Sequence, residues 1–158
     1  MGRLYDDLFA QHRVAERLLG ELAQQLNVLA AGGLSPELLD ALAVTHRTLY
    51  ADADHHFKEE ERALFPLIAE KVGGGADSIL APFLEDHRAF WQEMDSAGAA
   101  LAALQAGRSA ALPQLHDAVG AILVLLPDHI EREDTMLFPM AREVLSADEW
   151  VAAERSRP

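Results

Sequence analysis

Histidine and glutamate recur in this sequence at a spacing that suits metal binding. His56 is followed four residues later by Glu60, and His129 is followed four residues later by Glu133. Residues four apart lie on one face of an α-helix, roughly 40° apart around its axis. Each pair can therefore reach the same ion or two adjacent ions. Imidazole and carboxylate without thiolate suit iron, manganese or zinc more than copper(I).

Both pairs belong to a repeated stretch. His56–Pro66 and His129–Pro139 each lead from the His-x-x-x-Glu pair to Leu-Phe-Pro, and 73 residues separate the two copies. His12 precedes the first copy and His87 the second, 75 residues apart. The chain therefore reads as a tandem duplication of a two-helix unit.

The duplication suggests how two ions would be held. One ion takes the two histidines of the first half, the other ion takes the two of the second half, and both glutamates span the pair. Two glutamates facing each other in an apolar core would be costly to ionise without cations or shared protons. The predicted metal ligands are His12, His56, Glu60, His87, His129 and Glu133.

Helical geometry selects these ligands among their neighbours. The side chains on either side of Glu60 are rotated roughly 100° away from it, so only Glu60 shares the face of His56. The same argument prefers Glu133 to Glu131 and Asp134. Three other histidines are interpreted as structural or surface residues: His46, His55 and His116.

Apolar residues at helical spacing predict an all-α fold. They recur every three or four residues over four segments, at about 3–31, 35–72, 78–106 and 113–144. The stripes include Leu67 in the second segment and Met136 and Met140 in the fourth. Long helices with short links predict an antiparallel up-down four-helix bundle, in one domain over 1–158 with duplicated halves at about 3–72 and 78–144.

Local signals set the ends and the irregularities of these helices. Glycines end the first three segments, at 32–33, 73–75 and 107, and Ser35-Pro36 opens the second segment. Kinks are expected at Pro66, Pro127 and Pro139. Ser146–Glu149 reads as a capping box that starts a short C-terminal helix, with Trp150 packing back on the bundle.

Bulk composition narrows the classes of function. The chain has 158 residues and a formal net charge of −13, which argues against nucleic acid as a partner. It has no cysteine, so disulfides, zinc-thiolate sites and iron–sulfur clusters are excluded. The acidic N-terminus is unlike a signal peptide, and the longest apolar run, 118–126, is short for a membrane span. A cytoplasmic protein without a membrane partner is therefore expected.

These motifs resemble the hemerythrin-like (HHE cation-binding) domain family. The resemblance covers nearly the whole chain and rests on His12, His87 and the two His-x-x-x-Glu…Leu-Phe-Pro stretches. It implies a four-helix bundle that holds a non-haem di-iron centre with an oxo or hydroxo bridge. Members of the family bind dioxygen, sense oxygen, nitric oxide or iron, or decompose peroxide. A ferritin-like site would instead use Glu-x-x-His, a spacing that this sequence lacks.

One position departs from the oxygen-carrying members of that family. These have a second histidine four residues after the one in the third helix, where this chain has Trp91 after His87. One ion would then lack a nitrogen ligand, and Glu16, the corresponding residue in the first helix, is a candidate substitute. Exchangeable positions on the metal favour sensing, peroxide or nitric oxide chemistry, or metal handling over reversible oxygen carriage.

The sequence therefore predicts a di-iron protein that binds or reacts with dioxygen, peroxide or nitric oxide. If it is an enzyme, it would be a peroxidase-like or oxidase-like oxidoreductase. Two alternatives remain at this point: a non-enzymatic module that responds to iron or oxygen, and a zinc-binding structural bundle. Manganese or zinc would also suit the ligand set, and the oligomeric state is not predicted.

Overall fold

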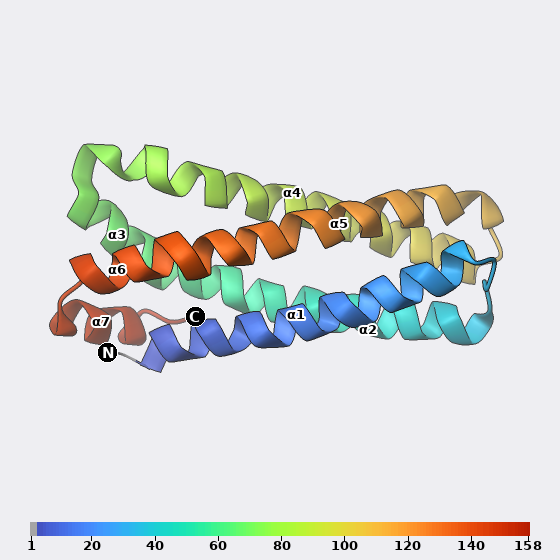
Figure 1. Cartoon of the computed structure of the whole chain (residues 1–158), viewed down its shortest axis with the longest axis horizontal. Coiled ribbons are helices and arrows are strands. Elements are labelled where there is room, and N and C mark those ends of the chain that lie inside the picture. Colours follow the sequence, from blue (N-terminus) through green and yellow to red (C-terminus); the bar gives the residue numbers. More distant parts are fainter. Residues whose placement is uncertain (1–2) are drawn as a thin grey trace.

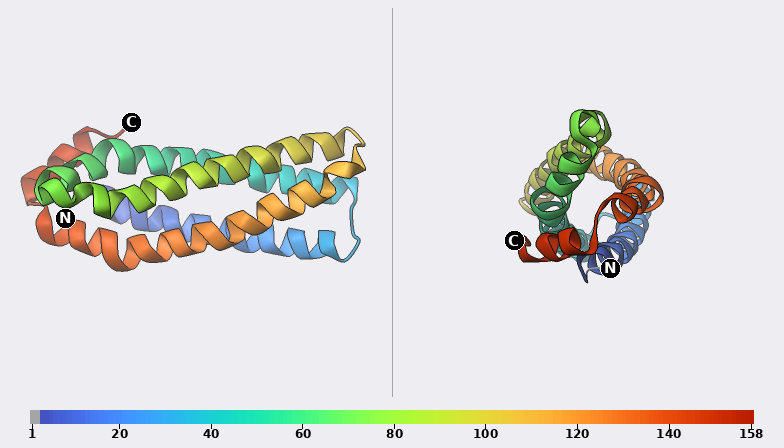
Figure 2. Two further views of the ribbon diagram at one scale, coloured as in Figure 1. Left: turned by 90° about the horizontal axis from the view of Figure 1, so that it is seen from above. Right: turned by 90° about the vertical axis from the view of Figure 1, so that its left-hand side faces the viewer.

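Four helical rods run up, down, up and down around one core (Figures 1 and 2). The structure is a computed structural model that describes residues 3–158, except the side chains at positions 74 and 76–78. It contains no strand within that range, which confirms the predicted all-α bundle. The rods are α1 (Arg3–Ala30), α2 (Pro36–Glu59) with α3 (Phe65–Val72), α4 (Ala76–Gln105), and α5 (Leu112–Arg132) with α6 (Phe138–Val144).

The helix ends follow the local signals in the sequence. Ser35 Oγ accepts a hydrogen bond from the Leu38 N–H at 3.1 Å, and a proline occupies the first turn of α2. Gly73, with φ of 57°, ends α3 in a conformation that glycine adopts most readily, and a short 3₁₀ turn (Gly73–Gly75) leads into α4. A second 3₁₀ turn, Ser109–Ala111, precedes α5.

A short helix, α7 (Ala147–Arg155), closes the end of the bundle beside the N-terminus of α1 (Figure 1). Its first turn has the predicted capping box, in which the Ser146 and Glu149 side chains each bind the other's backbone N–H. Trp150 is 3% exposed, and its ring meets Tyr5 of α1 edge-on at 5.6 Å. The expected packing of the terminal helix is confirmed.

Two rods contain a π-helical turn at the same place in the duplication. Glu60–Leu64 joins α2 to α3, and Glu133–Leu137 joins α5 to α6. Each turn comes just before a Leu-Phe-Pro proline, which has no N–H to donate and whose ring would crowd an α-helical carbonyl. The irregularities expected at Pro66 and Pro139 are therefore present, whereas α5 continues through Pro127 without interruption.

The π-helical turns change which side chains face inward. Each one adds about one residue to a helical turn, so later side chains are rotated by about 100° relative to a continuous α-helix. Met136, expected on the inner face, is 57% exposed, and Leu137 is buried instead. Leu67 is likewise only partly buried, while Ile68 is fully buried. The prediction was wrong at Met136 and one residue out of register at Leu67 for this reason.

Two apolar clusters fill the bundle, one on either side of a polar layer. The larger cluster includes Leu49, Phe57 and Phe90, and the smaller, near α7, includes Leu8 and Leu64. In each rod, the predicted ligands lie between residues of one cluster and residues of the other. The candidate metal site is therefore a layer of buried histidine and glutamate between two apolar clusters.

The segment Ser109–Val144 is long and apolar enough, by length and composition alone, to cross a membrane. A core helix of a bundle meets the same test, and this segment carries two of the buried polar residues described next.

Candidate metal centre

All six predicted ligands meet in the core of the bundle. His12 comes from α1, His56 from α2, His87 from α4 and His129 from α5, and each glutamate is the first residue of a π-helical turn. Their exposed fractions range from 0% for the glutamates to 7% for His56. They form two overlapping groups that share both glutamates: His12, His56, Glu60 and Glu133, and Glu60, His87, His129 and Glu133.

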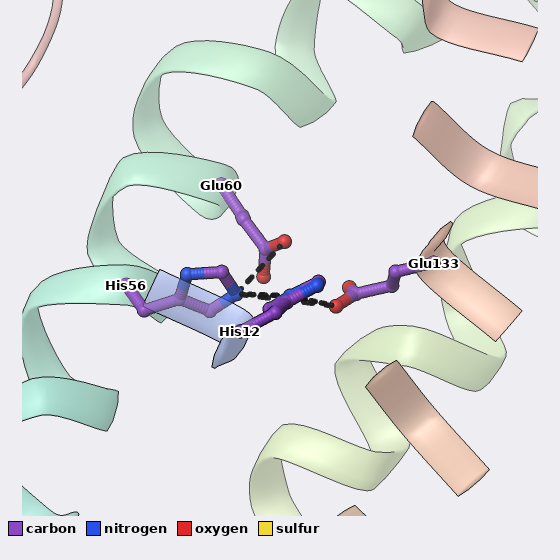
Figure 3. Close-up of side chains that lie close together, drawn as sticks. All are labelled: His12, His56, Glu60 and Glu133. Atoms are coloured by element: carbon purple, nitrogen blue, oxygen red, sulfur yellow. Dashed lines mark hydrogen bonds and ion pairs between the residues drawn. The ribbon is translucent and has the colours of Figure 1, made fainter. Parts of the chain in front are cut away.

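The first group, or first half-site, is shown in Figure 3. His56 Nε2 lies 3.3 Å from Glu60 Oε1, and His12 Nε2 lies 3.2 Å from Glu133 Oε2. The two Nε2 atoms are 3.0 Å apart. Metal bonds of about 2.0–2.2 Å, meeting at roughly 90–110°, would separate neighbouring ligand atoms by about 2.8–3.6 Å. The spacing therefore suits one ion among these atoms.

The second half-site uses the opposite oxygen of each glutamate. His87 Nε2 lies 3.3 Å from Glu60 Oε2, and His129 Nε2 lies 3.2 Å from Glu133 Oε1. Each carboxylate thus presents one oxygen to each half-site. Such an arrangement can hold two ions side by side and bridge them twice.

The buried polar atoms of this layer lack the partners that such atoms ordinarily have. Among the residues that the structure describes, none is a hydrogen-bond partner of either oxygen of Glu60 or Glu133, or of Nε2 of His87 or His129. Buried polar groups in folded proteins are almost always paired. Cations between these atoms would satisfy all of them, so the residues present fit a pair of metal ions.

Each imidazole also has a polar contact at Nδ1, on the side of the ring that faces away from the centre. His12 Nδ1 lies 2.6 Å from Asp134 Oδ1, and His87 Nδ1 lies 2.7 Å from Glu61 Oε1. With Nδ1 donating to these acceptors, Nε2 carries a lone pair directed into the centre.

The same arrangement holds the other two histidines. His56 Nδ1 lies 2.6 Å from Gln11 Oε1, and His129 Nδ1 lies 3.2 Å from Asp86 Oδ2. The lone pairs of His12 and His56 would then face each other across 3.0 Å. A cation or a proton must lie between them.

The pKa values of the centre show how strongly it favours positive charge. Burial by itself lowers the pKa of His56, but the charge of Glu60 and the contact with Glu133 raise it to about 10. Burial likewise opposes protonation of His87, yet its contacts with Glu60 and Glu61 raise its pKa. Burial raises the pKa of Glu60, but His56 and His87 hold it well below its ordinary value. A metal ion would compete with these protons.

The residues behind the imidazoles were not predicted from the sequence, although the duplication marks them. Gln11 and Asp86 occupy equivalent positions in the two halves, as do Glu61 and Asp134. Glu59, which lies behind the first half-site, was also missed. It is fully buried, and its Oε2 accepts a hydrogen bond from Gln11 Nε2 at 2.8 Å.

The position of the missing fifth histidine is not filled by a coordinating side chain. Trp91 is partly buried and packs on Phe57, whose ring stacks on His87 at a centroid distance of 3.7 Å. Glu16, the candidate substitute, is 44% exposed and pairs with Arg13 at 2.9 Å. The suggestion that Glu16 is a ligand is therefore wrong in this structure, because its side chain points to the surface of α1.

The fold and the site define a class: four-helix bundles with a histidine–carboxylate metal centre in the core. The sequence matches the hemerythrin HHE cation binding domain over residues 3–147, so the chain belongs to this family. It is also 28% identical, over 92% of its length, to the uncharacterized proteins Rv1995 of Mycobacterium tuberculosis and Mb2018 of Mycobacterium bovis. The chain spans 56% of the length of these relatives.

Proposed function

We propose that the chain holds two iron ions and that this centre binds or reacts with dioxygen, peroxide or nitric oxide. The observation that carries the proposal is the division of both carboxylates between the half-sites. One oxygen of Glu60 and one of Glu133 face each pair of histidines. Two ions bound there would lie next to each other, as cooperative chemistry on a diatomic molecule or a peroxide requires.

The ligand count leaves exchangeable positions on a metal that prefers six ligands, such as iron, but not on a four-coordinate zinc ion. Each half-site supplies two nitrogens and two oxygens. Four protein ligands complete the tetrahedral shell of a structural zinc ion, whereas a metal that prefers six ligands keeps two positions for exchangeable molecules. An iron pair, when bound, supplies Lewis acidity and reversible one-electron chemistry.

The chain's own residues would prepare this site for exchange. Acceptors on Nδ1 fix the direction of all four imidazoles before an ion arrives, which limits the reorganisation on binding. The two apolar clusters keep bulk water from the layer and strengthen every charge interaction in it. Phe57 against His87 covers part of the second half-site with a ring that does not coordinate.

Reconstitution with ferrous iron under anaerobic conditions tests the proposal. After exposure to air, we expect two irons per chain and the ultraviolet–visible charge-transfer bands of an oxo-bridged pair, which hydrogen peroxide or nitric oxide should then change. Glu60→Gln, which removes a bridging charge, is the matched variant and should lose these bands.

Other outcomes of the same experiment would replace the proposal. Bound zinc that iron does not displace would indicate a structural bundle. A large metal-dependent change in melting temperature, with no spectral response to any of the three molecules, would indicate a metal-responsive module.

A further inference from the structure

The two tryptophans and two tyrosines of the chain form two Tyr–Trp pairs. Tyr50 of α2 meets Trp91 of α4 at a centroid distance of 4.8 Å. Tyr5 of α1 meets Trp150 of α7 at 5.6 Å. In a chain without cysteine, tryptophan and tyrosine are the side chains that lose one electron most readily. All the side chains of this kind therefore lie in contact with another of the same kind.

A phenylalanine joins the Tyr50–Trp91 pair to the second half-site. The ring of Phe57 meets that of Trp91 edge-on at 5.6 Å and stacks on the imidazole of His87 at 3.7 Å. It also meets the ring of His129 at 5.7 Å. A continuous series of packed rings thus leads from Tyr50 to both imidazoles of the second half-site.

The other pair approaches the first half-site through Phe138 but is less accessible from solvent. The ring of Phe138 lies 6.4 Å from that of Tyr5 and stacks on His12 at 5.2 Å. Trp150 is 3% exposed and Tyr5 is partly buried, whereas Tyr50 is 40% exposed. The Tyr50–Trp91 pair is therefore the better placed to exchange electrons with a molecule in solution.

The Tyr50–Trp91 pair does not belong to the repeated pattern of the chain. The offsets of the duplication relate Trp91 to Glu16 and Tyr50 to Leu123. Phenylalanine would give the same kind of ring packing at either position, as Phe90 does beside Trp91 at 5.2 Å. The pair therefore adds two oxidisable rings that neither the duplicated scaffold nor its packing requires.

We propose that Trp91 and Tyr50 form a one-electron route between the second half-site and solvent. Reduction of hydrogen peroxide to two molecules of water takes two electrons and two protons. Where the bound metal pair does not supply both electrons, the indole of Trp91 gives one electron to the oxidised centre across Phe57 and His87.

The phenol of Tyr50 then gives one electron to Trp91, and its O–H proton passes to water. A one-electron reductant in solution, with a proton from water, restores the phenol. The inference rests on the proposed function for the presence of iron and for the reaction with peroxide, but electron transfer along the rings can be measured without peroxide.

Flash photolysis of the whole chain tests the route. Every sample carries Tyr5→Phe, so that Tyr50 is the only tyrosine. The chain is loaded with ferrous iron or with zinc in the absence of air, and photo-generated ruthenium(III) tris-bipyridine in solution oxidises Tyr50. Transient absorption follows the tyrosyl radical. We expect it to decay at least about tenfold faster with ferrous iron than with zinc, because an electron from the centre reaches Tyr50 through Trp91.

Variants at the tryptophans identify the path. Trp91→Phe keeps an aromatic ring and should return the decay to the rate seen with zinc, whereas Trp91→Tyr restores an oxidisable ring and should keep the fast decay. Trp150→Phe, the matched control, removes a tryptophan outside the route and should leave the decay unchanged. Circular dichroism and metal content identify variants that keep the bundle.

Tyr50→Phe provides a second test at an exposed position, so the result does not depend on the folding of a Trp91 variant. The radical should then form on Trp91 and again decay faster with iron than with zinc. Equal lifetimes with bound iron and bound zinc would overturn the proposal, as would a fast decay that survives Trp91→Phe.

The same samples separate this inference from the proposed function. A chain that binds no iron would overturn both. A ferrous chain that is inert to dioxygen, peroxide and nitric oxide would contradict the proposed function alone, because the decay of the radical would still report electron transfer through Trp91.

Discussion

The Nδ1 contacts set the direction of the imidazoles residue by residue. Three of the four acceptors are carboxylates, and the exception is Gln11 behind His56. A carboxylate behind an imidazole raises the basicity of its Nε2 more than a neutral amide does. The two half-sites therefore differ in electronics even though each offers two imidazole Nε2 atoms and two carboxylate oxygens as candidate ligands.

Asp134→Asn tests the importance of these contacts. Asp134 holds His12 through Nδ1 and also pairs with Arg13 on the surface of α1. We expect the variant to bind metal at the first half-site about 10–100-fold more weakly, because loss of such an acceptor loosens the ligand and lowers its basicity. Competitive titration with a chromophoric chelator measures this change. Asp117→Asn, at an 86% exposed side chain, is the control.

An Asp134→Asn variant with unchanged affinity, or a loss matched by the control, would contradict this account of the contact.

At the scale of elements, the π-helical turns separate the positions whose burial sequence periodicity predicts from those whose burial it does not. The helices, and the helix face that carries His56 and Glu60, follow a regular α-helical period. The helix caps follow local sequence signals. The period shifts from each π-helical turn onwards, so Met136, within the second turn, is exposed although an uninterrupted helix would bury it. Pro66 and Pro139 indicated that the helices would be irregular near these positions. They did not indicate that the irregularity would be a π-helical turn and not a bend.

The attachment of α7 gives a prediction about pH. Lys71 Nζ lies 2.7 Å from Glu149 Oε1, and this contact, with the hydrogen bonds from Ser146, lowers the pKa of Glu149 to about 2. A lowered folded-state pKa stabilises the fold above the ordinary value near 4.5, and the effect is lost as pH falls towards 2. Melting temperatures of the original chain and of Glu149→Gln should differ at pH 7 and converge by about pH 2.

Salt will reduce this difference, because the pair is partly exposed and screened. A gap between the two melting curves that stays constant from pH 7 to pH 2 would show that the charge of Glu149 has no part in it.

The segment after α7 returns to the bundle and pairs with a buried carboxylate. Arg157 Nε lies 2.5 Å from Glu59 Oε1, and its Nη1 lies 2.7 Å from Asp7 Oδ2. Glu59 is fully buried and contacts Gln11, which in turn holds His56. A connected set of polar contacts therefore runs from the C-terminal segment to the first half-site.

Arg157→Ala should destabilise the fold by about 1–3 kcal/mol, because it leaves the buried charge of Glu59 without its main cation. Urea unfolding measures this loss. Adding Glu59→Gln to the variant should recover part of it, since the unpaired charge is then removed. A double variant less stable than Arg157→Ala would contradict this reasoning.

At the scale of the whole molecule, the duplication made the residues of the candidate metal site predictable. A repeated spacing on two helices is visible in one sequence, and it located all six residues that meet in the core. The supporting residues were missed because they act across helices. Glu61 and Asp134 lie off the ligand face of their own helices, and their role becomes visible only when α4 and α1 are packed beside them.

Metal removal should weaken the whole fold, because the polar layer joins all four rods. Without ions, the glutamates and histidines of this layer depend on shared protons. An ion present at about 100 times its dissociation constant stabilises a folded protein by about 2.7 kcal/mol. Calorimetry with and without a strong chelator should therefore show a melting temperature several degrees lower after metal removal, restored on adding metal. An unchanged melting temperature would contradict metal binding within the core.

The most direct measurement of the central claim is anomalous X-ray scattering from a crystal of the iron-loaded chain, collected on both sides of the iron absorption edge. Two iron peaks are predicted in the buried layer, one by His12 and His56 and the other by His87 and His129, with Glu60 and Glu133 contacting both. A single peak, or peaks elsewhere with the two glutamates bound to neither, would contradict the proposed dinuclear centre.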